Sequence, residues 1–223
     1  MTAVAVNRDP VAQEPQEPQD RPLGRPLDIT GLVEWPLPVG RVDFDEGLAY
    51  LHAVDPGGYT TDHLDQAPDD WRRWELLDGV VVVSPAPGYD HQRVVIRLGA
   101  ILLAAEQGLK RTLVAPFDVP VSLKKRFQPD VLVLPDRETR LPLLAVEVLS
   151  RYGRRYDTEE KRVAYQNAGI RSYWIVDPKV PSVTVHLLGG NGCYDVVATI
   201  RGDEPCELAE PFPVAFRPAD LLT

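Results

Sequence analysis

The chain has 223 residues, of which 44% are hydrophobic and 26% charged, a balance typical of a globular protein that buries a core. No apolar stretch approaches the ~20 residues that cross a bilayer, and the N-terminus lacks a signal-peptide core, so we expect a cytoplasmic protein without membrane contact. The net charge of −9 excludes a surface that grips nucleic acid everywhere, and the two cysteines, Cys193 and Cys206, exclude a disulfide scaffold and a cysteine-rich metal site.

The chain divides into three parts. Residues 1–28 contain five prolines among Gln, Glu, Asp and Arg, which predicts a disordered Pro-rich leader. We expect residues 29–70 to be an accessory segment that wraps the domain, and within it residues 42–54 are compatible with a short helix. Residues 71–223 are predicted to form the folded domain.

Within residues 71–223 strand and helix patterns alternate. Two apolar runs joined by Asp78-Gly79 predict a hairpin over 73–85, and helical spacing predicts an amphipathic helix over 90–107. A second helix is expected over 157–169, with Asp157 and Glu160 as its capping pair. Strands are expected at 112–123 (bent by its prolines), 128–135, 141–150, 172–178, 183–188, 193–200 and 207–216, with residues 124–127 as a turn. This order predicts an α/β (α+β) fold, a mixed sheet flanked by helices.

A carboxylate interrupts the most apolar of these strands. Residues 141–150 are apolar on both faces, which predicts a central strand, yet Glu147 lies in its middle. A glutamate is rarely buried unless it is paired or binds a metal. Either this face of the strand opens to solvent, or Glu147 belongs to a site.

Asp130 opens the preceding strand. After Pro129 an aspartate is also ordinary turn chemistry. Because the two strands are consecutive, we expect them to be neighbours, which would bring Asp130 and Glu147 close together. Two adjacent carboxylates take up a proton or bind a cation, and Mg²⁺ commonly binds one or two carboxylates.

Lys161 is the third break in the pattern. Positions 161, 164, 165 and 168 fall on the helix face that turns toward the sheet. A lysine on that face either extends to solvent or meets an acidic partner. Glu147, on the strand before this helix, is the simplest partner.

Weaker candidates for the same pocket each have an ordinary structural explanation. Glu75 is also compatible with an outward-facing edge-strand residue, and His91 with a histidine of the helix core. Gln128 and Asp118 are also compatible with a loop residue and the cap of a bend. The basic stretches 124–126 and 151–155 are either solvated loops or a local patch that contacts DNA phosphates. The residues considered for phosphate contact are Lys124, Lys125, Arg154 and Arg155.

Four segments together resemble a known family. QPDVLVL, LAVEVLS and EEKRVAYQNAGIRSYWIVDP, with the opening segment WELLDGVVVVSPAPGYDHQRV, resemble the Uma-two family of restriction-endonuclease-like proteins, within the PD-(D/E)XK nuclease superfamily. The likeness covers about residues 72–190. It implies a restriction-endonuclease-like fold, with a mixed central sheet and helices on its two sides.

The resemblance also implies roles for individual residues. Pro129-Asp130 matches the PD element and Glu147 the second acid. The lysine expected two residues later is replaced by Leu149, and the resemblance implies that Lys161 supplies this amine from the next helix.

A metal-dependent hydrolysis of DNA is the implied activity. Asp130 and Glu147, with a backbone carbonyl next to Glu147 (that of Val148), would hold Mg²⁺ or Mn²⁺, which activates water toward a phosphodiester. Lys161 would orient that water or stabilise charge on the phosphorus.

Besides a purely structural, self-associating protein, two functions are open at this point. One is an active DNA endonuclease, which the joint presence of Asp130, Glu147 and Lys161 favours. The other is a catalytically inactive nuclease fold that binds nucleic acid or regulates, which the charge of −9 favours. Exposed strand edges at 183–188 and in the C-terminal strands predict a homodimer, which is compatible with either function.

Overall fold

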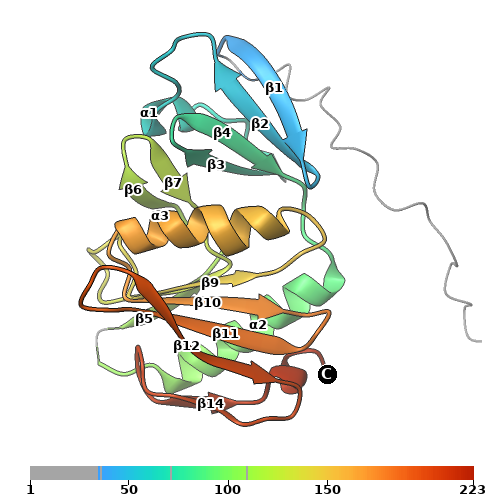
Figure 1. Cartoon of the computed structure of the whole chain (residues 1–223), viewed down its shortest axis with the longest axis vertical. Helices are drawn as coiled ribbons and strands as arrows, with labels where there is room; N and C mark the ends of the chain where they lie inside the picture. The colour runs from blue at the N-terminus through green and yellow to red at the C-terminus, as the bar shows by residue number, and fades with distance from the viewer. Residues whose placement is uncertain (1–34, 36, 71, 109) are drawn as a thin grey trace, which may run out of the picture.

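The computed structural model describes residues 35, 37–70, 72–108 and 110–223. Two sheets lie one above the other with a helix between them (Figure 1). The leader predicted over residues 1–28 lies outside the described residues. No helix in the described ranges is long and apolar enough to cross a membrane.

The first sheet is antiparallel throughout and has six strands. The Asp78-Gly79 turn predicted from the sequence has φ angles of 49° and 82°, the left-handed pair that a tight hairpin turn requires. In spatial order its strands are β1 (Val39–Asp45), β2 (Leu48–Ala53), β4 (Val80–Ser84), β3 (Arg73–Leu77), β7 (Lys125–Phe127) and β6 (Val119–Ser122).

The helix expected over residues 42–54 is wrong, because β1 and β2 form a hairpin there. Glu46 and Gly47 have φ angles of 45° and 78°, so this turn repeats the geometry of Asp78-Gly79. A short helix, α1 (Thr61–Leu64), follows the hairpin. Because β2 pairs with β4, residues 39–53 extend the first sheet, and the division of the chain at residue 71 stays a prediction.

The second sheet is mixed, because β9 and β10 are parallel while the other neighbours are antiparallel. The prediction that residues 141–150 form a central strand is confirmed: β9 lies between β10 and β8. In spatial order the strands are β12 (Tyr194–Arg201), β11 (Ser182–Leu188), β10 (Ser172–Asp177), β9 (Leu144–Val148), β8 (Val131–Leu134) and β5 (Arg111–Val114).

The segment 112–123 differs from the single bent strand that was expected. Its first part, β5, joins the second sheet, and its last part, β6, joins the first. Pro116, which has no N–H to donate, lies in the crossing between the sheets. The turn expected at 124–127 is largely the strand β7, which the first sheet needs as a neighbour for β3 and β6.

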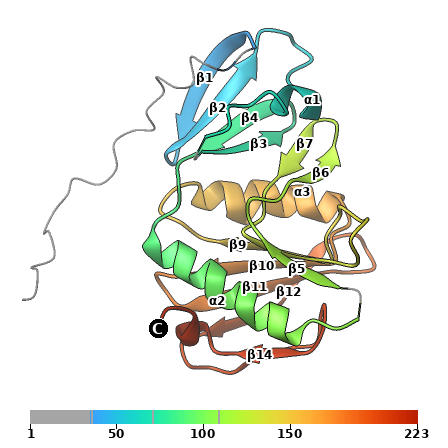
Figure 2. The ribbon, with the colours of Figure 1, turned by 180° about the vertical axis from the view of Figure 1, so that it is seen from behind.

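Two helices cover opposite faces of the second sheet (Figures 1 and 2). The helix α2 (Tyr89–Ala105) buries Val94, Val95, Leu98 and Leu102 against one face, as its periodicity predicts. The other face packs on a continuous helix made of a π-helical turn, η2 (Tyr156–Lys161), and α3 (Arg162–Asn167). These layers confirm the predicted mixed sheet flanked by helices.

The C-terminal segment closes the α2 side of the core. Its strands β13 (Cys206–Leu208) and β14 (Val214–Phe216) form a separate two-stranded sheet, followed by a 3₁₀ turn, η3 (Pro218–Leu221). The edge expected at 183–188 is wrong, because β11 is paired on both sides and β12 is the edge strand. Val196 and Val197 are exposed on β12, and the homodimer stays a prediction.

Gly47 is a position where the fold requires a glycine. A Cβ atom built there would lie 2.2 Å from the ring of Tyr152, whereas one at Gly169, whose φ is almost the same, would meet nothing within 4 Å. We expect Gly47→Ala to lower the free energy of unfolding by about 1 kcal/mol more than Gly169→Ala. Urea denaturation of both variants checks this, and equal losses would show that Tyr152 moves aside freely.

Candidate active site

The register of β8 and β9 brings the two predicted acids together. Val131 pairs with Val146 and Leu132 with Ala145, so one further step along the ladder places Asp130 opposite Glu147. Residues directly opposite in an antiparallel pair have Cβ atoms about 5 Å apart. The adjacency of the two strands, expected from their order, is therefore confirmed.

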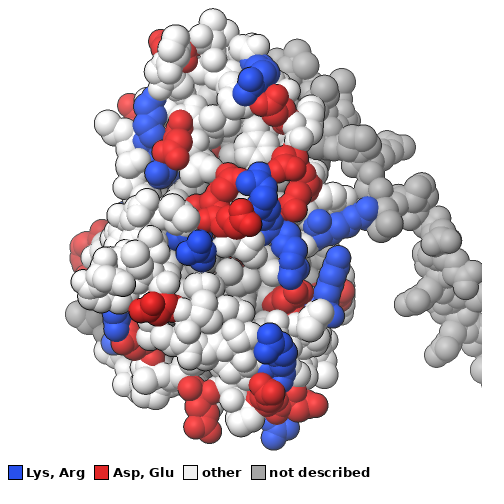
Figure 3. All heavy atoms as spheres, in the orientation of Figure 1, with Lys and Arg blue, Asp and Glu red and all other residues white. Residues whose placement is uncertain are grey.

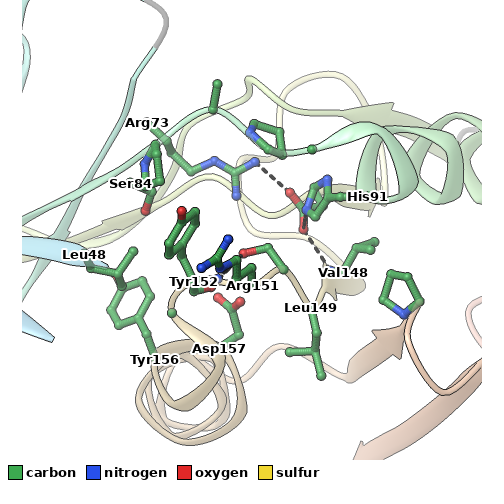
Figure 4. Close-up of a pocket in the computed structure, with 18 of the residues that line it drawn as sticks. Leu48, Arg73, Ser84, His91, Val148, Leu149, Arg151, Tyr152, Tyr156 and Asp157 are labelled. Carbon is green, nitrogen blue, oxygen red and sulfur yellow. Dashed lines mark hydrogen bonds and ion pairs between the residues drawn. The ribbon is translucent and has the colours of Figure 1, made fainter. Parts of the chain in front are cut away.

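Asp130 is buried and fully hydrogen-bonded. Nη2 of Arg73 donates to its Oδ1 at 2.6 Å, and the backbone N–H of Val148 donates to its Oδ2 at 2.8 Å. Nε2 of His91 lies 3.0 Å from the same Oδ2 (Figure 4). Burial opposes ionisation, but the charge of Arg73 and the hydrogen bond from His91 outweigh it and hold the pKa of Asp130 well below its usual value.

Lys161 contacts three carboxylates, and we call its amine the hub of the site. Its Nζ lies 3.0 Å from Oε1 of Glu75, 3.1 Å from Oε1 of Glu147 and 3.4 Å from Oδ1 of Asp157. Burial alone would lower the pKa of Lys161, but these carboxylates raise it above its usual value, so the amine stays charged. The predicted contact between Lys161 and Glu147 is therefore present.

Glu147 is the acid whose ionised form is least favoured by its surroundings. The hydroxyl of Tyr165 donates to its Oε1 at 3.0 Å, while its Oε2 has no partner in the part of the chain that the structure covers. Burial raises the pKa of Glu147 well above its usual value, and Lys161 offsets this rise only in part because Asp157, Asp130 and Glu75 add to it.

The cluster contains more acidic side chains than basic ones. Four carboxyl groups, those of Glu75, Asp130, Glu147 and Asp157, surround two permanent cations, Arg73 and Lys161. Burial raises the pKa of Asp157 to about 6, again against the attraction of Lys161. The surplus negative charge favours uptake of a proton or of a further cation.

The π-helical turn helps to position the hub. It spans Tyr156–Lys161 and widens the helix by one residue per turn before α3 begins. Asp157 and Lys161 lie four residues apart along it and contact each other. The predicted role of Asp157 as a helix cap is wrong, because the helix already begins at Arg154 and the Asp157 side chain is directed to Lys161.

Glu75, Asp130, Asp157, Arg73 and Lys161 line a cavity of about 450 Å³, whereas Glu147 is fully buried behind its wall. Its walls come from β3, the loop between β4 and α2, the end of β9 with the loop after it, η2, and residues that follow β10 (Figure 4). The cavity thus lies at the carboxyl ends of the two parallel strands, a common location for ligand sites in sheets of this kind.

Of the four weaker pocket candidates, two line the cavity and two do not. Glu75 and His91 line the cavity. Gln128 and Asp118 lie outside the set of residues that line it, because the Gln128 side chain donates to Asp118 at 2.9 Å. The backbone N–H of Gln128 does contribute, since it donates to Oε1 of Glu75 at 2.7 Å.

The four cations considered for phosphate contact are all engaged within the chain. Lys124 donates to backbone carbonyls, and Lys125 pairs with Asp78. Arg154 pairs with Asp177, and Arg155 with Asp45 and Glu160. Basic and acidic side chains are intermixed on the face seen in Figure 3, which fits this pairing.

Three site residues were missed by the sequence analysis in this role: Arg73, Asp157 and Tyr165. Arg73 alternates with Glu75 along β3, which puts both on one face, and this spacing is a signal that was available. Tyr165 follows Lys161 by four residues on the helix face already assigned to the sheet. Their contacts with acids on other strands depend on the tertiary fold.

The donor set suits a hard divalent cation. Oε2 of Glu75 and Oε2 of Glu147 are buried oxygens that lack a partner among the described residues. Carboxylate oxygens of this kind are the ligands that Mg²⁺ and Mn²⁺ prefer. Within the described ranges no three His, Cys, Asp or Glu side chains are already arranged around a metal position. Of the two side chains predicted as ligands, Glu147 has such an unpartnered oxygen, whereas both oxygens of Asp130 already have hydrogen-bond partners.

Fold and site together define a nuclease-like α/β protein. The chain is similar in structure to one described as a "putative nuclease belonging to DUF820 from Anabaena variabilis", with a TM-score of 0.60 and 16% identity over 73% of this chain and 97% of that one. A family profile described as "Putative restriction endonuclease" matches residues 61–222. The chain belongs to this family, Uma2. The search of curated proteins found no match.

Glu147→Gln tests the charge surplus. Above the usual glutamate pKa of 4.5 the unfolded chain releases a proton that the folded state retains, so Glu147 makes stability fall as pH rises. In EDTA we expect the variant to match the parent near pH 4.5 and to exceed it by about 1–2 kcal/mol at pH 8. Urea denaturation measures this, with Glu159→Gln, an exposed position on the same helix, as control. A variant less stable at pH 8 would contradict the prediction.

Lys161→Met tests the hub. Removing the amine leaves buried carboxylates unpaired, so we expect a loss of about 3–5 kcal/mol at pH 8, against about 0.5 kcal/mol or less for Lys179→Met on the surface. Adding Glu147→Gln should recover part of the loss. Strict additivity in this double-mutant cycle would show that the two side chains are not coupled.

Proposed function

We propose that the protein is a metal-dependent endonuclease that hydrolyses phosphodiester bonds in DNA. The main support is the cluster of four carboxyl groups, three of them buried, around two permanent cations beside the cavity, with two acid oxygens left without a partner in the described chain. Membership of a family described as "Putative restriction endonuclease" supports the same reaction class.

In this proposal Asp130 and Glu147, with the carbonyl of Val148, would hold Mg²⁺ or Mn²⁺. A metal held there would polarise a phosphoryl oxygen and lower the pKa of a water molecule. Hydrolysis then forms one bond between the water oxygen and phosphorus and breaks one bond from phosphorus to a strand oxygen, which takes up a proton.

The chain's own residues prepare this reaction. Arg73 and Lys161 supply positive charge next to the phosphate, and their contacts with Asp130, Glu75 and Glu147 fix these acids in place. Lys161 has three carboxylate contacts, which favours a role in positioning these acids and stabilising charge.

His91 is a candidate for proton transfer. Its Nε2 lies 3.0 Å from Asp130, while its Nδ1 has no partner among the described residues. A histidine oriented by an aspartate in this way is a common acid–base catalyst.

Metal titration distinguishes the endonuclease from the inactive regulatory module. We expect Mn²⁺ binding by calorimetry in the parent protein and in Glu159→Gln, and its loss in Asp130→Asn and Glu147→Gln. Cleavage of plasmid DNA in Mg²⁺ should fall at least ~100-fold in both site variants.

Two different outcomes would contradict two different parts of the proposal. Unchanged cleavage in either site variant would refute the assignment of the acids. A parent protein that binds no Mn²⁺ at millimolar concentration would favour the regulatory module. Circular dichroism of each variant checks that the fold is intact.

A further inference from the structure

The acid cluster lies below the surface: Glu75, Asp130 and Asp157 line the cavity, and Glu147 lies behind its wall. Glu147 is 0% exposed, Glu75 and Lys161 are 1% exposed, and Asp130 is 2% exposed. A cavity of about 450 Å³ between two sheets is the size of a small-ligand pocket. Enzymes that act on a base use single strands or take the nucleotide out of the duplex. A phosphate site below the surface likewise favours a flexible strand over a rigid duplex.

Two cations at the cavity are free for a ligand. Arg151 and Lys179 line it, are exposed, and have no ion-pair partner in the described part of the chain. They differ in this from the paired Arg154 and Arg155, which begin the helix after the loop that carries Arg151. Proteins that grip duplex DNA commonly use many phosphate contacts, whereas two cations suit a short stretch of one strand.

An exposed aromatic ring accompanies these cations. Tyr89, the first residue of α2, lines the cavity and is 77% exposed, with no hydrogen bond or ring contact to another described residue. Tyr152 also lines the cavity, and the guanidinium of Arg151 lies 5.5 Å from the centre of its ring. Aromatic rings beside cations are the usual platform for bases of single-stranded nucleic acid.

We propose that the substrate is single-stranded DNA or an unpaired end. Its base stacks on Tyr89, and Arg151 and Lys179 bind phosphates next to the one that reaches the acid cluster. This inference rests on the proposed nuclease function, and it names the substrate class of the same site.

A binding assay under conditions without cleavage tests the proposed preference for single strands. Fluorescence anisotropy in EDTA compares a short labelled oligonucleotide with a hairpin duplex of the same sequence. We expect the single strand to bind at least ~10-fold more tightly, and Tyr89→Ala to weaken that binding ~5-fold or more while Tyr89→Phe retains it. Ile96→Ala, an exposed residue further along α2, is the matched control and should have no effect.

The cationic part of the inference has its own readout. Arg151→Gln should weaken single-strand binding and reduce the slope of log affinity against log salt by about 0.7, the value for one phosphate contact. Arg137→Gln should change neither, because Arg137 is an exposed arginine between β8 and β9, outside the residues that line the cavity.

Failure of this inference can be told from failure of the proposed function. Equal or tighter binding of the duplex, absence of binding to both forms, or a Tyr89→Ala variant that behaves like Ile96→Ala overturns the single-strand inference. Single-strand binding as expected, without cleavage in Mn²⁺, counts against the nuclease and leaves the inference standing. Cleavage of duplex as fast as single strand overturns the inference and supports the nuclease.

Discussion

The ammonium group of Lys161 is the interaction on which the rest of the structure depends. Its three carboxylate partners come from β3 of the first sheet, β9 of the second sheet and the π-helical turn. A buried charge is tolerated only when its partners are in place, and loss of one partner leaves the others uncompensated. The same contacts that assemble the site therefore tie the two sheets and the helix together, and the site forms only when all three have docked.

The site also holds more negative charge than the fold needs for stability. A buried ion pair with matched charges would suffice to join the sheets, yet Asp130 and Asp157 add two further carboxyl groups, and only Arg73 accompanies them as a permanent cation. Unpaired acid oxygens and raised carboxyl pKa values are unfavourable in a folded protein. Departures of this kind from a stable core are expected where function requires them.

The sequence singled out the acids and the lysine because each interrupts an apolar pattern, and the adjacency of the two strands was expected from chain order, whereas their register is known only from the structure. Other features depend on partners far along the chain. Arg73 lies at the start of a strand, where an arginine is usually solvated, and only the fold brings it to Asp130. The pairing of Arg155 with Asp45 and of Lys125 with Asp78 likewise joins distant segments, so their assignment to phosphate contact could not be tested from the sequence. The hairpin of β1 and β2 was missed because its Glu46-Gly47 turn is a weaker signal than Asp78-Gly79.

Charge also links the metal and the substrate under the proposed function. A surplus of buried carboxylate attracts a divalent cation and also repels a phosphodiester, about half as strongly at the same distance because the phosphodiester carries a single charge. Arg73 offsets part of this repulsion at Asp130, while Glu147 is offset only by the shared amine of Lys161. A strand that binds to Arg151 and Lys179 at the rim would therefore move inward only after the carboxylate charge is neutralised. Affinity at the rim and reactivity at the bottom of the cavity are thus set by different residues, and they can be changed independently.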